Sequence, residues 1–271
     1  MSHITAEENL DTEPRENLRI RAEKILTAEG GEFDKISPAD VKNLVLELKK
    51  HQAQLEMQNE ELQRAEAEVQ HSLEKLTKAL DGTVLALANT VEMRDPYTAG
   101  HQRRVAQLAY AIAQEMGFPA ERVEGMRVLG CLHDIGKIAI PAEILSKPGR
   151  LSPMEFRLIK DHPRVGYEII KDIDFPFPLA EGILQHHERL NGSGYPLGIS
   201  GPDITLEARI LGVADVVEAM ASHRPYRMAL GIDQALEEIS RNRGILYDPE
   251  VVDICLKIFA EKGFSFSPYL H

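Results

Sequence analysis

The chain has 271 residues, of which 43% are hydrophobic, and it carries a formal net charge of −12 at pH 7. That length and apolar content allow a sizeable core in one large domain or two ordinary ones. The acidic balance argues against a surface that binds nucleic-acid polymers or anionic membranes, although it is compatible with a small basic pocket for a phosphate ligand.

Residues 1–36 are polar, contain the break Gly30-Gly31 and lack the apolar segment of a signal peptide. We expect them to form a loosely ordered N-terminal segment. No apolar run of the sequence approaches the roughly 20 residues that cross a bilayer. The sequence therefore predicts a soluble, cytoplasmic protein that is not inserted in a membrane.

Residues 37–82 are predicted to form a helical coiled-coil segment. Ser37 and Pro38 are typical of a helix start. Apolar side chains then recur every seven residues, at Val41, Leu48, Leu55, Leu62, Val69 and Leu76. This period is the signature of a coiled coil, so we expect a parallel homodimer through residues 41–80. The second apolar seam is polar at its centre, and the alternative is one amphipathic helix that lies on the following domain.

The composition changes after Asp81-Gly82, and residues 83–271 are predicted to form one all-α domain. A proline that follows Ser152, with Glu155 three residues after it, indicates a capping box at a helix start. Cys131 and Cys255 stand in apolar surroundings, which is typical of buried reduced thiols. The expected helices cover residues 83–94, 95–116, 120–132, 153–171, 178–188, 206–220, 233–242 and 248–260.

Several polar side chains with metal-binding chemistry interrupt these apolar helices. They comprise five histidines and two aspartates: His101, His133, Asp134, His162, His186, His187 and Asp215. Any single histidine of this kind is usually an ordinary hydrogen-bonded side chain. An unpaired carboxylate inside the apolar helix of Asp215 would be expensive, however, so that residue requires a cation or hydrogen-bond donors. Helices that face a shared interior can direct all seven side chains to one point.

Imidazoles combined with carboxylates favour Fe, Mn, Ni or Zn over Ca or Mg. Seven ligands exceed what one tetrahedral zinc ion needs, so a two-metal site fits better. Two such ions lie about 3.5–4 Å apart, activate a water molecule and hold the oxygens of a phosphoryl group. An aspartate can bridge them, and adjacent histidines such as His186 and His187 can approach one ion at neighbouring positions.

Five segments of the chain resemble those of HD-GYP domains, in the same order, from about residue 83 to residue 260: DPYTAGHQRRV, LHDIGKIAIP, KPGRLSPMEF, HHERLNGSGYP and ADVVEAMASHRPYR. The resemblance implies an all-α, HD-type helical bundle that hydrolyses cyclic di-GMP at an iron or manganese centre. By position, it makes the seven residues above the metal ligands, with Asp134 as the bridge. It makes Asp134 and Lys137 the catalytic residues. Lys137, Tyr195, Arg224 and Arg227 become the substrate-binding residues.

The chain departs from the family pattern at three positions. Tyr97 stands where one subgroup has a glutamate that helps to hold a third metal, so we expect two divalent ions per chain and regard His101 as the ligand most in question. Asn191 and Glu218 stand where aspartates are common, which leaves the proton-transfer roles open.

The predicted activity is therefore a phosphodiesterase in which a metal-activated hydroxide opens cyclic di-GMP to linear pGpG, with further cleavage to GMP left open. A related alternative acts on another cyclic dinucleotide or on nucleotides. An alternative of another class is a catalytically weak module that binds cyclic dinucleotides or proteins, including diguanylate cyclases through the GYP loop. A pure binding module would be free to lose metal ligands, whereas all seven are present.

Overall fold

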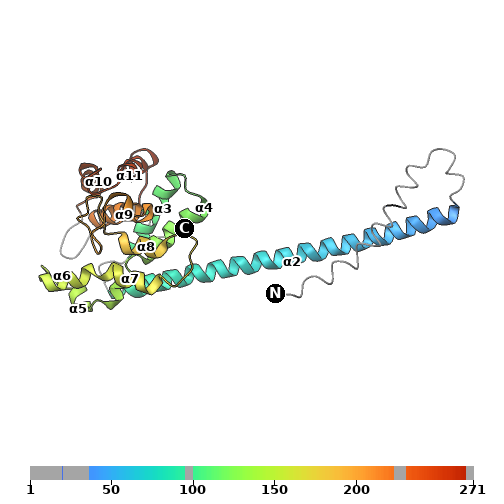
Figure 1. The fold of residues 1–271 in the computed structure, drawn as a ribbon, viewed down its shortest axis with the longest axis horizontal. Coiled ribbons are helices and arrows are strands. Elements are labelled where there is room, and N and C mark those ends of the chain that lie inside the picture. The colour runs from blue at the N-terminus through green and yellow to red at the C-terminus, as the bar shows by residue number, and fades with distance from the viewer. Residues whose placement is uncertain (1–19, 21–36, 95–99, 223–229, 267–271) are drawn as a thin grey trace. The chain divides into compact units, whose positions relative to one another are not determined.

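The computed structural model describes residues 20, 37–94, 100–222 and 230–266 (Figure 1). The chain divides into two compact units, Met1–Thr77 and Lys78–His271. Apart from residue 20, the N-terminal segment expected over residues 1–36 lies outside the described residues, as do Tyr97, Arg224 and Arg227.

Helix α2 spans Pro38–Glu92 and is 55 residues long. It begins as expected, because the Oγ of Ser37 accepts a hydrogen bond from the backbone N–H of Asp40 at 3.2 Å. The break expected at Asp81-Gly82 is wrong, since the helix continues through both residues. One interior glycine costs a helix only about 1 kcal/mol relative to alanine. Packing of the last turns compensates for it, because Ala88 and Val91 are buried in the second unit.

The first unit exposes the apolar residues of the seven-residue repeat. Leu48, Leu55, Leu62, Val69 and Leu76 are 44–60% exposed. Exposed apolar side chains in such a stripe are unfavourable in water. A seven-residue apolar period is the pattern that a partner helix covers in a coiled coil.

The second unit is all-α, as the sequence predicts, and the described residues contain no β-strand. After α2 its elements are α3 (His101–Glu115), α4 (Ala120–Leu132), the 3₁₀ helix η2 (Ile135–Ala139), α5 (Ala142–Leu145), α6 (Pro153–Lys160), α7 (His162–Ile170), α8 (Leu179–Gln185), the 3₁₀ helix η3 (Gly201–Asp203), α9 (Leu206–Ala221), α10 (Ile232–Arg241) and α11 (Pro249–Lys262). No described helix is both long enough and apolar enough to cross a membrane.

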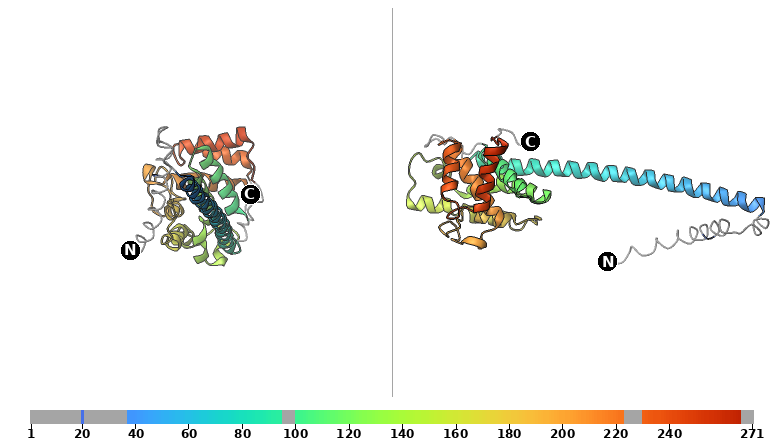
Figure 2. Two further views of the ribbon diagram at one scale, coloured as in Figure 1. Left: turned by 90° about the vertical axis from the view of Figure 1, so that its right-hand side faces the viewer. Right: turned by 90° about the horizontal axis from the view of Figure 1, so that it is seen from above.

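These helices form layers around one core. Figures 1 and 2 show α10 and α11 packed on α9 and α3, with α5, α6 and α7 on the other side of α8 and α9. Fully buried Leu108, Ile112, Leu129, Ile183 and Ile210 come from α3, α4, α8 and α9. The candidate ligands therefore lie at the ends or on the inner faces of helices that the core fixes.

The single helix expected over residues 153–171 is divided into two helices, α6 and α7. The capping box of Ser152 and Glu155 is present and opens α6, but the helix expected to reach residue 171 ends at Lys160, and α7 follows. Pro163 has no N–H to bond the carbonyl four residues before it, which belongs to Ile159. The imidazole of His162 bonds that carbonyl instead, at 2.7 Å. The proline thus ends one helix and leaves a backbone acceptor that orients a candidate ligand.

Candidate metal centre

Three candidate histidines share one geometry at the end of a helix. Each bonds the carbonyl three residues earlier through its Nδ1, with distances of 2.7 Å from His133 to Gly130, 2.7 Å from His162 to Ile159 and 2.6 Å from His186 to Ile183. The last carbonyls of a helix have no intrahelical partner, so these bonds satisfy them. A carbonyl only accepts, so each Nδ1 carries the proton and each Nε2 presents a lone pair.

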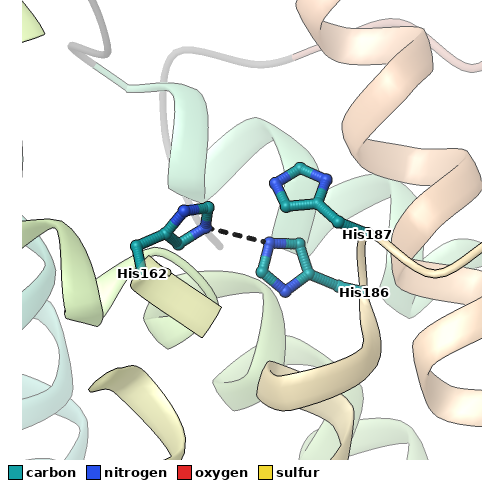
Figure 3. A group of neighbouring side chains, drawn as sticks. All are labelled: His162, His186 and His187. Atoms are coloured by element: carbon teal, nitrogen blue, oxygen red, sulfur yellow. Dashed lines mark hydrogen bonds between the residues drawn. The ribbon is translucent and has the colours of Figure 1, made fainter. Parts of the chain in front are cut away.

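Those lone pairs face one another. The Nε2 atoms of His162 and His186 are 3.4 Å apart (Figure 3), and the Nε2 of His133 is buried without a hydrogen-bond partner among the described residues. Burial lowers the pKa of His133 and lowers that of His186 to about 3, so both rings are neutral near pH 7. Converging lone pairs repel unless a cation lies between them. Neutral imidazoles with their second nitrogen held by a carbonyl are how proteins present histidine to metals, so the residues fit a metal ion.

Asp134 lies between the histidines and directs its two oxygens to different sides. Its Oδ1 is 3.2 Å from the Nε2 of His162, and its Oδ2 is 3.5 Å from the Nε2 of His133 and 3.9 Å from that of His101. Burial alone would raise the pKa of this carboxyl, but the Lys137 ammonium and the neighbouring histidines hold it well below its usual range. Asp134 is therefore an ionised carboxylate with one oxygen available to each side.

Asp215, from the apolar helix α9, completes the cluster. Its Oδ1 is 3.2 Å from the Nε2 of His101, and its Oδ2 is 3.9 Å from the Nδ1 of His187. The structure brings all seven predicted ligands together in three overlapping groups whose ligand atoms lie within 4.8 Å of one another: His162, His186 and His187; His101, His133 and Asp215; and His133, Asp134 and His186. The adjacent histidines are not redundant, since His187 belongs to the first group and His186 to the first and the third.

Glu218 is a residue whose role sequence reasoning missed. Its buried carboxylate contacts the Nδ1 of His101, accepts from Arg104 at 2.6 Å and accepts from Ser222 at 2.5 Å. It therefore turns the Nε2 of His101 toward Asp215, in the way that carboxylates orient histidine ligands. The available signal was its position three residues after Asp215, on the same face of α9.

The surroundings of His101 attract positive charge strongly. Burial alone would lower the pKa of His101, but hydrogen bonds to Asp215 and Glu218 outweigh burial and raise it to about 9. A proton on Nε2 stands where a metal ion would bind, beside two carboxylates. The position is therefore suited to a cation despite Tyr97, which itself lies outside the described residues.

The glycine loop after His187 closes one side of the centre. The ring of Tyr195 stacks on that of His187, with centroids 4.6 Å apart. A side chain at Gly194 would meet the Cα of Glu188 at 2.4 Å, so only glycine permits this approach. Glu188, which sequence reasoning also left without a role, anchors the loop by accepting from the N–H groups of Leu197 at 2.6 Å and Gly198 at 3.1 Å.

The predicted substrate-binding residues are only partly described. Lys137 was expected on the face of His133 if the helix continued, but α4 ends at Leu132 and Lys137 lies in η2. Its Nζ is nevertheless at the centre, 2.6 Å from the Oδ2 of Asp134. Arg224 and Arg227 lie outside the described residues, so the predicted basic pair stays a prediction.

Comparisons with known proteins agree with this geometry. The family model described as HD domain matches residues 86–251. The chain is 42% identical over 177 residues to the cyclic di-GMP phosphodiesterase response regulator RpfG of Xanthomonas campestris, covering 65% of this chain and 47% of that protein. It is also 42% identical over 181 residues to a cyclic di-GMP phosphodiesterase of Thermotoga maritima, covering 66% and 49%. The chain thus spans about half the length of these relatives.

A solved structure of a cyclic GMP-AMP specific phosphodiesterase from V. cholerae superposes with a TM-score of 0.50. The match covers 66% of this chain and 48% of that one, at 19% sequence identity, and so it establishes a likeness of fold.

Proposed function

The chain belongs to the HD domain family, in its HD-GYP branch, and on that premise we propose that it is a metal-dependent phosphodiesterase that hydrolyses cyclic di-GMP. The observation that carries the proposal is the convergence of five imidazoles and two carboxylates in one buried cluster. The names of two relatives at 42% identity support the substrate class.

The cluster has the composition and layout for two divalent ions per chain. One side offers His101, His133 and Asp215, the other offers His162, His186 and His187, and Asp134 presents one oxygen to each side. Imidazole and carboxylate ligands favour iron or manganese over calcium or magnesium. Such ions would supply Lewis acidity that activates water and stabilises charge on phosphoryl oxygens.

The chain's own residues prepare the site for an anionic substrate. Lys137 places its ammonium beside Asp134, where it can bind a phosphate oxygen. Tyr195 stacks on the ring of His187 and so covers one face of a proposed ligand. We assign Arg224 and Arg227 to the phosphate groups as well, since the guanidinium fork matches phosphate oxygens. Asp134 and Lys137 are the proposed catalytic residues.

The proposal is tested on protein purified without oxygen, with its metals counted and its products separated by chromatography. We expect about two ions per chain, conversion of cyclic di-GMP to linear pGpG, and GMP as a second product if the linear form is cut again. Parallel incubation with 3′3′-cyclic GMP-AMP determines the preference between cyclic dinucleotides. Binding without turnover by fully metallated protein would contradict the proposal and favour the binding module.

We also propose that the protein is a homodimer through residues 41–80, since the exposed apolar repeat on α2 has the period that a second copy of the same helix covers. Contact with a diguanylate cyclase through the GYP loop, residues 191–196, stays a prediction.

A further inference from the structure

Lys160, the last residue of α6, stands two residues before the candidate ligand His162 and between two aromatic rings. Its Nζ lies 4.9 Å from the ring centroid of Phe156 and 5.1 Å from that of Tyr195. The Tyr195 ring in turn stacks on that of His187. His187, Tyr195, Lys160 and Phe156 are therefore in contact in that order, starting from the metal centre. Phe156, the last of them, is 47% exposed to solvent.

Lys160 differs from nearby lysines in the partners of its ammonium group. Lys137, Lys147 and Lys171 pair with Asp134, Glu155 and Glu168 respectively. Lys160 makes no ion pair with a carboxylate in the part of the chain that the structure describes. A ring face attracts an ammonium but does not neutralise it. Lys160 is thus held in place with its charge still available to an anion.

The proposed substrate has chemistry for such a place. A cyclic dinucleotide carries two phosphodiesters and two purines, and the metal centre acts on one phosphodiester at a time. The other phosphodiester keeps its negative charge, and the purines have faces that stack on aromatic side chains. Lys160 and the exposed ring of Phe156, next to the metal centre, match the second phosphodiester and a purine respectively.

We propose that Lys160 and Phe156 form a second subsite, in which Lys160 binds the phosphodiester that is not being cut and Phe156 stacks on a purine. This inference rests on the proposed function and deepens it, because it assigns recognition of the cyclic dinucleotide to residues outside the metal cluster.

The test compares two substrates of the full-length, metallated protein. Cyclic di-GMP has the second phosphodiester and the purines, whereas bis(p-nitrophenyl) phosphate is a single diester without either. We expect Lys160→Met, which keeps the aliphatic stem, to weaken the Kd and raise the KM for cyclic di-GMP by about 10-fold, the ratio that corresponds to about 1.4 kcal/mol. Its kcat/KM for bis(p-nitrophenyl) phosphate should stay unchanged. Phe156→Ala should act in the same direction, and Lys160→Arg should restore most of the affinity.

Lys171→Met is the matched control, since it removes a lysine charge that pairs with Glu168. It should leave the kinetic constants for both substrates unchanged. An unchanged Kd for cyclic di-GMP in Lys160→Met would overturn the subsite. Equal decreases in kcat/KM for both substrates would also overturn the subsite, because Lys160 would then act by positioning Tyr195 and the metal centre.

Calorimetric binding separates this inference from the proposed function. Wild-type protein that binds cyclic di-GMP without turnover would sink the phosphodiesterase assignment, while weaker binding by Lys160→Met would still support the subsite. Wild-type protein that neither binds nor cleaves a cyclic dinucleotide would overturn both.

Discussion

A Cβ atom placed on Gly136 would lie 1.9 Å from the carbonyl oxygen of His162. The backbone of η2 therefore touches the start of α7, and no side chain fits between them. This contact sets the distance between the elements that carry Asp134 and His162, whose Oδ1 and Nε2 are 3.2 Å apart. Gly136 has no side chain and cannot bind a metal through one, yet it contributes to the geometry of the candidate metal centre.

Gly136→Ala should separate η2 from α7. We expect destabilisation of about 1–3 kcal/mol from overpacking, together with loss of bound metal. Denaturant unfolding and plasma mass spectrometry measure the two effects. Gly82→Ala is the matched control, because a Cβ there meets nothing within 4 Å and alanine should stabilise the helix by about 0.5–1 kcal/mol. If both variants behave alike, the close approach does not govern the site.

Asp134→Asn should abolish turnover and lower the metal content, since it removes the carboxylate that faces both sides of the cluster. Loss of even an outer partner of a metal ligand costs about 10–100-fold, so we expect a decrease in turnover of at least about 100-fold. Asp253→Asn serves as control because that carboxylate pairs with Arg243 on the surface. Near-normal turnover by folded, metallated Asp134→Asn protein would rule out the bridging role.

Glu218→Gln should weaken metal binding by about 10-fold, because the amide is neutral and no longer holds His101 through a charged bond. Chelator competition measures the affinity. Glu207→Gln is a close control, since Glu207 is also a buried carboxylate of α9 and pairs with Arg122. It should cost stability without changing metal affinity. Equal metal affinities in the two variants would show that Glu218 has only a structural role.

The exposed repeat on α2 predicts the state of assembly. Introducing Leu55→Lys and Leu62→Lys together should convert the dimer to a monomer in light scattering, because both charges would lie in the apolar seam. Ala67→Lys adds a charge to α2 outside that seam and should leave the dimer intact. A dimer that survives the double substitution would place the main interface elsewhere.

Tyr97 carries the prediction on metal number. A phenol with its ordinary pKa of about 10 is a poor ligand near neutral pH, so we expect two ions per chain in the wild type. Tyr97→Glu should place a carboxylate four residues before His101 in the sequence and raise the count toward three. Plasma mass spectrometry and anomalous scattering give the count and the positions. Three full ions in the wild type would mean that residue 97 does not control the number.

Much of the fold and the whole candidate ligand set follow from short stretches of sequence. The ends of α4 were predicted to the residue, and the capping box at Ser152 opens α6 as expected. These signals are local, because a cap or a proline acts on backbone groups within one helical turn. The seven candidate ligands were found for the same reason, since each belongs to a short polar motif at a helix end or, for Asp215, inside the apolar helix α9.

The tertiary structure determined the contacts between residues that are far apart in the sequence, which local signals do not contain. Gly82 does not end α2, because the buried Ala88 and Val91 outweigh the cost of one glycine. His101 and Glu218 meet although they are 117 residues apart, and only the packing of α3 against α9 brings them together. Which oxygen of Asp134 faces which histidine depends in the same way on the contact of η2 with α7. Residue type determined the chemistry that each side chain can perform, and packing between distant helices determined which atoms converge to perform it.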